Sequence, residues 1–244
     1  MHLLGYALAV VIGISLGLLG GGGAILTVPV LVYVMGMDVK QAVPTSLVIV
    51  GLTAFSGMLR HRAAGTLDVR AAVTFGPAAI LGSLIGTRAA LLVASEVQLV
   101  VFGVILLAAA TMMLRPRREA LHPARPHGLP LIVVIGTGVG FLTGFIGVGG
   151  GFMYVPALAL LAGLDMKKAV GTSLALIAMS SAAGVGGYLG RVEFDWLLVG
   201  LFAGLAFAGV QIGSALVPKV PQERLRRWFA VLLLVMGVVV LIRR

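Results

Sequence analysis

Two glycine clusters are the residues of this chain best suited to chemistry. Gly20–Gly23 and Gly147–Gly151 each precede a short apolar segment that contains a proline. Backbone N–H groups at a helix start can donate to an anion, the helix dipole favours negative charge there, and glycine allows close approach. The clusters therefore predict a binding site for a small oxyanion. The candidate binding glycines are Gly20, Gly21, Gly22, Gly23, Gly147, Gly149, Gly150 and Gly151.

Close helix packing is the second interpretation of these glycines. Small residues spaced four apart let membrane helices approach one another, and we assign five such pairs to packing. These pairs are Gly13/Gly17, Gly82/Gly86, Gly140/Gly144, Gly200/Gly204 and Gly209/Gly213. The clusters differ from the pairs, because several consecutive glycines cost much helix stability and packing alone rarely requires them.

Polar side chains that could complete the site occur in two matched pairs and one isolated amide. Thr45–Ser46 and Thr172–Ser173 follow the predicted turns at Asp38 and Asp165. In an antiparallel hairpin these hydroxyls would lie beside the prolines and could donate to an oxyanion; alternatively, they bond to the carbonyl four residues earlier. Gln211 lies within an apolar run, where its amide would join helices or line a cavity.

An internal duplication relates these candidates to one another. The segment Gly17–Leu47 recurs 127 residues later as Gly144–Leu174, with 15 of 31 positions identical, and the register continues to Asp68/Asp195. Duplicated apolar segments with matched glycine interruptions are typical of secondary transporters.

The composition predicts an all-α polytopic membrane protein. Hydrophobic residues make up 60% of the chain and charged residues 11%, against about 25% charged residues in soluble domains. Several uncharged stretches reach the roughly 20 residues that cross a bilayer. The net charge of +10 lies in short loops between spans, as the positive-inside bias produces, so we expect no nucleic-acid partner. The absence of cysteine excludes disulfides and thiolate metal sites, and we expect no cofactor.

Each half is expected to hold five helical elements. Residues 1–114 form the first repeat, residues 115–128 a basic proline-rich linker, and residues 129–244 the second repeat. The expected elements are Leu3–Leu19, Ala24–Met35, Val39–Leu59, Val69–Val93 and Val97–Leu114, then Leu129–Ile146, Gly151–Ala162, Met166–Leu189, Trp196–Val217 and Arg224–Ile242. The second element of each half is too short to cross a bilayer. Loop charges favour an inverted pseudo-two-fold relation over a parallel one, although Arg243–Arg244 opposes it.

Charges at the ends of the predicted spans have simpler interpretations. Arg60, His61 and Arg62 end a span and are expected to mark a cytoplasmic boundary, and Arg88 also ends a span. A cationic gate is the alternative to side chains that snorkel to the interface. The four histidines are all expected to fall in termini or loops, which argues against an intramembrane Ser–His enzyme.

These motifs resemble the TauE/SafE family of sulfite exporters, within the 4-toluene sulfonate uptake permease group. The resemblance rests on Gly20–Gly23 through Pro29, then Asp38–Lys40 and Thr45–Ser46–Leu47, and on their second copies after residue 147. It implies a permease of the cell (inner or plasma) membrane that moves sulfite, an organosulfonate or a related oxyanion, with export the expected direction.

The alternatives are an anion channel of the same fold and a membrane structural or assembly protein. The expected partners are the anion and the lipid bilayer, and small-residue faces would allow a homodimer.

Overall fold

The computed structural model describes residues 2–114, 129–147, 151–161 and 163–242, and this part of the chain is helical throughout with connecting turns. The first half contains α1 (His2–Leu19), α2 (Gly22–Pro29), α3 (Val39–Ala63), α4 (Val69–Leu92) and α5 (Ser95–Leu114). The second half contains α6 (Leu129–Ile146), α7 (Gly151–Pro156), α8 (Met166–Tyr188), α9 (Trp196–Leu216) and α10 (Gln222–Ile242). The expected linker at residues 115–128 lies outside the described residues.

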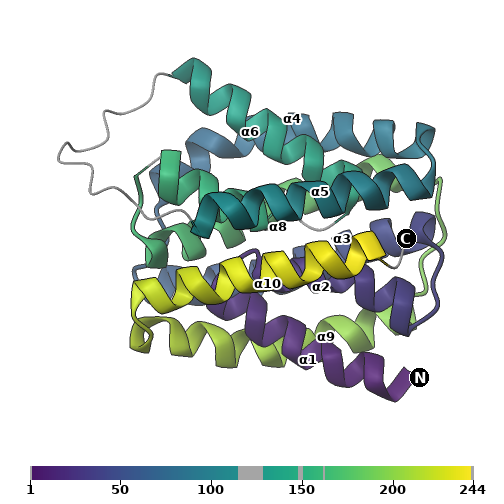
Figure 1. The fold of residues 1–244 in the computed structure, drawn as a ribbon, viewed down its shortest axis with the longest axis horizontal. Coiled ribbons are helices and arrows are strands. Elements are labelled where there is room, and N and C mark those ends of the chain that lie inside the picture. The colour runs from purple at the N-terminus through teal and green to yellow at the C-terminus, as the bar shows by residue number, and fades with distance from the viewer. Residues whose placement is uncertain (1, 115–128, 148–150, 162, 243–244) are drawn as a thin grey trace.

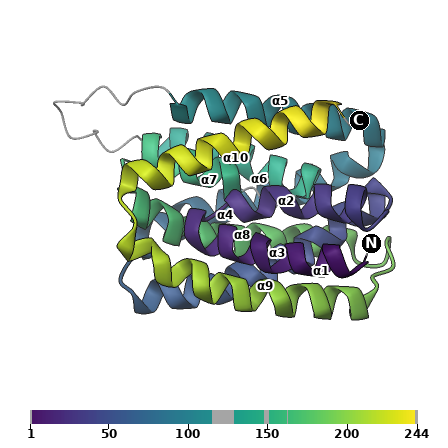
Figure 2. The same ribbon diagram turned by 60° about the horizontal axis from the view of Figure 1, so that its bottom comes forward.

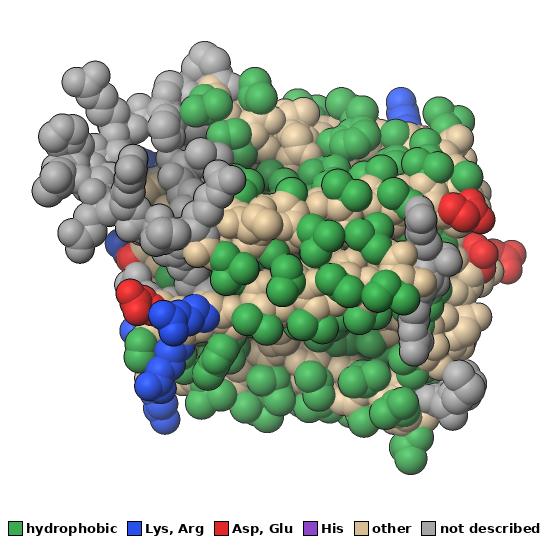
Figure 3. Space-filling view, in the orientation of Figure 1, with side chains coloured by type: hydrophobic (Ala, Val, Ile, Leu, Met, Phe, Trp, Pro, Cys, Tyr) green, Lys and Arg blue, Asp and Glu red, His purple; other side chains and the backbone are tan. Residues whose placement is uncertain are grey.

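The protein is a multi-pass membrane protein. Six of the described helices are long and apolar enough to cross a bilayer, namely α3, α4, α5, α8, α9 and α10. Large apolar side chains such as Leu52, Phe55, Leu201 and Val231 are exposed on the outside of the bundle, and apolar side chains cover the visible face between its ends (Figure 3). A surface of this kind is stable in hydrocarbon and not in water.

Equivalent helices of the two halves run in opposite directions. Both chain termini lie at one end of the bundle, whereas α5 ends and α6 begins at the other end (Figures 1 and 2). Consequently α1 and α6 are antiparallel, as are α5 and α10. The first helix of each half packs on the fourth helix of the opposite half: α1 packs on α9, and α6 packs on α4. These directions are the ones that an inverted pseudo-two-fold requires.

Glycines form the contacts between these exchanged partners. A Cβ atom at Gly13 would overlap the carbonyl oxygen of Ala206, and one at Gly140 would overlap that of Ala79. The glycines of four predicted packing pairs all behave in this way: Gly13, Gly17, Gly82, Gly86, Gly140, Gly144, Gly209 and Gly213. The assignment is wrong for Gly200 and Gly204, which face open space, because Gly200 lies about 180° around α9 from Gly209.

The second element of each half is a broken helix, as expected. After Pro29 the chain continues as a π-helical segment, Val30–Val34, and after Pro156 as Ala157–Leu161. Proline has no N–H group and therefore interrupts the α-helical hydrogen bonds, so the next turn shifts to wider spacing. Gly36 and Gly163 follow with φ of +73° and +69° and turn the chain into α3 and α8.

Aspartates cap the helices that follow the turns. Asp38 and Asp68 accept hydrogen bonds from the backbone N–H groups of Lys40 and Ala71, at 2.8 and 2.9 Å. Asp165 and Asp195 do the same at the starts of α8 and α9. An Asp at this position satisfies a free N–H group and favours the positive end of the dipole. The loop charges at Asp38 and Asp165 therefore serve as helix caps.

Candidate functional site

Two glycine turns lie at the centre of the bundle. Gly20 ends α1 and Gly147 ends α6, with φ of +68° and +77°. The Cα of Gly20 faces Ser173 and Val170 of α8, and the Cα of Gly147 faces Val43 of α3. Each turn therefore rests on the third helix of the opposite half. The left-handed φ and the absence of space for a Cβ both require glycine there.

The paired serines are buried at these same contacts. Ser46 Oγ lies within hydrogen-bond distance of two carbonyl oxygens, those of Val43 (2.9 Å) and Gly147. Ser173 Oγ donates to the carbonyl oxygen of Val170 at 2.8 Å and lies against Gly20. A hydroxyl carries one proton, so each serine satisfies one carbonyl at a time. The back-bonding that the sequence predicts is present, with the acceptor three residues earlier, and the glycine turn of the opposite half is the neighbour that the sequence could not identify.

The paired threonines have different surroundings. Thr172 Oγ1 accepts a hydrogen bond of 3.0 Å from the backbone N–H group of Asp68, which holds the α3–α4 loop against α8. That bond leaves the hydroxyl proton of Thr172 available to another acceptor. Thr45 is buried, and its hydroxyl makes no hydrogen bond to the described residues.

The remaining glycines of the first cluster divide between the two interpretations. Gly23 faces the backbone of Ile12 and Leu16 in α1, and Gly22 faces Leu19 and Leu232, so both allow close packing. Gly21 precedes α2, where no side chain caps the first N–H groups. Those donors are the ones that an anion would need. Gly149 and Gly150 lie outside the described residues, and Gly151 begins α7.

Two buried hydroxyls near the prolines were missed at the level of sequence. Thr27 and Tyr154 occupy equivalent positions, two residues before Pro29 and Pro156, and both are almost wholly buried. The Thr27 hydroxyl has no hydrogen-bond partner among the described residues, whereas the Tyr154 hydroxyl lies beside the hydroxyls of Ser180 and Thr143. A buried polar group without a partner is costly, so Thr27 would be stabilised by water or by a polar solute. A polar residue at the same register in both halves was the available signal.

Gln211 joins two helices, which is one of its two predicted roles, since its Oε1 accepts a hydrogen bond of 3.2 Å from Arg60 Nη1 at the end of α3. The prediction that His61 lies in a loop is wrong, since α3 continues to Ala63 and His61 is only 2% exposed. One turn of additional helix brings the imidazole inward, whereas Arg60 and Arg62 remain exposed.

Among the described residues, basic side chains gather at the end of the bundle opposite the termini, mainly at the left of Figure 3. Those at this end are Arg60, Arg62, Arg70, Lys167, Lys168, Lys219, Arg224 and Arg227, whereas Lys40, Arg88 and Arg191 lie at the end that carries the termini. The two ends of the bundle therefore differ strongly in charge.

Comparison with known proteins identifies the family. The sequence model of the sulfite exporter TauE/SafE family matches residues 5–240. A probable membrane transporter of Xylella fastidiosa is 30% identical over 240 residues, covering 95% of this chain and 92% of that protein. A probable membrane transporter of Methanocaldococcus jannaschii is 26% identical over 254 residues, covering 96% and 95% of the two chains. No solved structure matches the chain. The family and the relatives' names indicate membrane transport rather than catalysis, and the chain belongs to the sulfite exporter TauE/SafE family.

Proposed function

We propose that this protein is a secondary permease that exports sulfite or an organosulfonate and binds the anion near the bilayer midplane, between the two halves. The observation that carries the proposal is the reciprocal contact at the centre, where Gly20 meets Ser173 and Gly147 meets Ser46. Each contact combines a buried glycine turn with a buried hydroxyl. Each serine hydroxyl donates to a carbonyl oxygen, so an oxyanion would replace that carbonyl as the acceptor, without a fixed charge being buried.

The surrounding groups support the same ligand class. The start of α2 has no side-chain cap, and the hydroxyl of Thr27, within the same helix, has no partner among the described residues. Their unsatisfied hydrogen bonds would be completed by a small solute with several oxygens. Irregular backbone at membrane depth is tolerated where protein buries it or where it lines a polar cavity; the glycine turns are buried by protein, and a substrate path would run beside them.

The charge difference between the two ends supports an orientation. Membrane proteins keep their Lys- and Arg-rich loops in the cytoplasm, so the basic end would face the cytoplasm and both termini the outside. The chain contains no cysteine, which makes single-cysteine labelling unambiguous. We expect Lys219→Cys to react with an impermeant maleimide only from the cytoplasmic face and Arg191→Cys only from outside. The opposite pattern would reverse the assignment.

The substrate class is tested with purified protein in liposomes. Fluxes of sulfite, thiosulfate, sulfoacetate, sulfate and chloride are compared, with empty liposomes as the control. We expect one or more of the sulfur anions to be transported with saturation and counterflow, since a carrier exchanges its solute across the membrane. A preference for chloride over every sulfur anion would contradict the substrate, and flux without saturation or counterflow would indicate a channel.

A further inference from the structure

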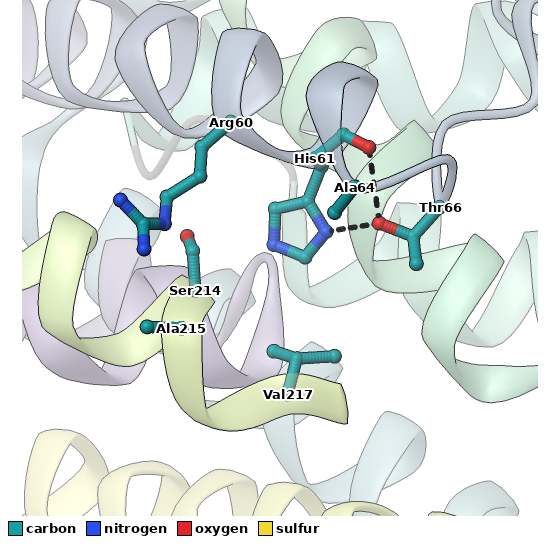
Figure 4. Close-up of a pocket in the computed structure, with 7 residues that line it drawn as sticks. All are labelled: Arg60, His61, Ala64, Thr66, Ser214, Ala215 and Val217. Carbon is teal, nitrogen blue, oxygen red and sulfur yellow. Dashed lines mark hydrogen bonds between the residues drawn. The ribbon is translucent and has the colours of Figure 1, made fainter. Parts of the chain in front are cut away.

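A cavity lies at the basic end of the bundle, about one helical turn from Gly20, because its lining residue His61 contacts the carbonyl oxygen of Gly17. It has a volume of about 200 Å³ and lies between the end of α3 with its following loop and the end of α9 (Figure 4). The lining includes Arg60, His61, Thr66, Ser214, Ala215 and Val217. A water molecule takes up roughly 30 Å³ in the liquid, so the cavity accommodates a four-atom oxyanion together with a few waters.

Ser214 supplies an unused donor to this cavity. Its side chain is only 6% exposed, and its Oγ has no hydrogen-bond partner among the described residues. Figure 4 shows the oxygen directed into the space between Arg60 and His61. The equivalent residue of the first half, Thr87, is also buried, but its hydroxyl donates to the carbonyl oxygen of Ser83 at 2.9 Å. Of these two equivalent hydroxyls, the one at Ser214 is therefore free of a partner among the described residues, and the one at Thr87 is not.

Arg60 supplies the positive charge at the rim. Its guanidinium has five N–H donors, and the hydrogen bond from Nη1 to Gln211 Oε1 (3.2 Å) uses one of them. Gln211 therefore positions the guanidinium while leaving donors for a ligand. The repeat-equivalent positions, at the other end of the bundle, hold Gly187 in place of Arg60 and Leu84 in place of Gln211.

His61 forms a wall of the cavity and is not a ligand. Its Nδ1 lies 2.8 Å from Thr66 Oγ1 and its Nε2 lies 3.3 Å from the carbonyl oxygen of Gly17. Both ring nitrogens are thus engaged by the protein. These contacts hold the loop after α3 against α1 and fix one side of the cavity.

The local dipoles make the charge of Arg60 necessary. α3 and α9 both end near the cavity, and helix C-termini carry partial negative charge. An anion would be repelled there without a full positive charge, which Arg60 provides, together with the other basic side chains at this end.

We infer that the Arg60–Ser214 cavity is a second oxyanion site, which captures the substrate at the cytoplasmic end before it reaches the central turns. The inference rests on the proposed function for the identity of the anion. The repeat-equivalent positions at the other end of the bundle offer neither the arginine nor the free hydroxyl, and they include Glu193 in place of Thr66. The site therefore serves one face of the membrane.

The test uses sulfite uptake into inside-out vesicles, whose outer surface is the cytoplasmic face. We expect Arg60→Gln to raise the half-saturating sulfite concentration about tenfold, as expected for loss of a charge-assisted contact, with a nearly unchanged maximal rate. Ser214→Ala should raise it roughly threefold, and Arg60→Lys should fall between wild type and Arg60→Gln. Arg62→Gln is the matched control, because Arg62 is a nearby exposed charge of the same end that does not line the cavity.

The outcomes separate this inference from the proposed function. Equal half-saturation for Arg60→Gln and Arg62→Gln, with Ser214→Ala like wild type, would overturn the second site while leaving sulfite transport intact. A similar loss for substrate offered at the opposite face, in right-side-out vesicles, would also overturn it. Failure of the wild-type protein to transport any sulfur oxyanion would instead contradict the proposed function. If Arg60→Gln does not fold, Ser214→Ala decides the question.

Discussion

The central glycine turns and the cavity at the basic end differ in how they relate to the duplication. At the centre, each feature occurs twice, since Gly20 rests on α8 and Gly147 rests on α3 in the same way. At the basic end, Arg60 of the first half lies near Gln211 and Ser214 of the second, and the repeat-equivalent positions hold Gly187, Leu84 and Thr87. Features that both halves keep can serve two alternating states of a transporter equally. Features that are present at one end of the bundle alone are suited to setting the direction.

The strongest way to break the central contact is a methyl group at one glycine turn. Gly147→Ala places a Cβ against the backbone of Val43 and forces alanine to adopt a φ of +77°. We expect a loss of roughly 2–5 kcal/mol in the free energy of unfolding, from the left-handed strain and the overlap together. Denaturant unfolding in detergent measures it.

Gly36→Ala is the matched control for that change. Gly36 has nearly the same φ, +73°, but faces open space. The free energy of unfolding of Gly36→Ala should therefore fall by only about 1–2 kcal/mol, which is the cost of placing alanine in the left-handed conformation. Equal losses at the two glycines would show that the contact with α3 contributes nothing.

Lys40 is the centre of a hydrogen-bond network that joins the start of α3 to the end of α4 and to α5. Its Nζ donates to the carbonyl oxygens of Ala90 (2.6 Å) and Val93 and to Gln98 Oε1 (3.0 Å). Gln98 in turn donates to the carbonyl oxygen of Phe145 at 2.8 Å, which joins α5 to α6. Lys40→Met leaves these acceptors without their donor, so we expect a loss of roughly 1–3 kcal/mol in unfolding free energy.

Gln98→Leu separates the two roles of this network. Leu225 occupies the equivalent position in the second half, so leucine is compatible with the fold there. We expect a smaller loss than for Lys40→Met, because Lys40 would still cap the end of α4. A larger loss would mean that the link to α6 is the main contribution.

The serines test whether the centre is functionally symmetric. Ser46→Ala and Ser173→Ala each remove one buried donor beside a glycine turn. If both contribute to the substrate path, each variant should lower the maximal rate of sulfite flux about tenfold, equivalent to ~1.4 kcal/mol. The two effects should agree within about threefold, or ~0.6 kcal/mol. A loss confined to one variant would show that the duplicated contact is symmetric in geometry only.

Much of the architecture could be predicted from the sequence, because helix length, glycine interruptions and proline position are local properties. The broken elements at Pro29 and Pro156 and the ends of α5, α6 and α8 follow from them within a few residues. The exchange of partners could not be predicted, since Gly20 and Ser173 are distant in sequence and nothing local relates them. His61 was misplaced for a different reason: two flanking arginines resemble a loop, yet helical rotation of 100° per residue turns only the imidazole inward.

Gln211→Leu is the mildest change and addresses the difference between the two ends most directly. It gives the second half the residue that the first half has at Leu84, and it removes the acceptor that holds Arg60 Nη1 at 3.2 Å. Arg60 keeps its charge but becomes free to sample other rotamers, so capture of the anion should weaken less than when the charge itself is lost. We expect the half-saturating sulfite concentration at the cytoplasmic face to rise about threefold, or ~0.6 kcal/mol, with the maximal rate unchanged.

The double variant Arg60→Gln/Gln211→Leu should then have the same half-saturating concentration as Arg60→Gln alone, because a positioning residue has no effect once the group that it positions is gone. Additive losses would instead place Gln211 in contact with the anion, as its position within an apolar run first suggested.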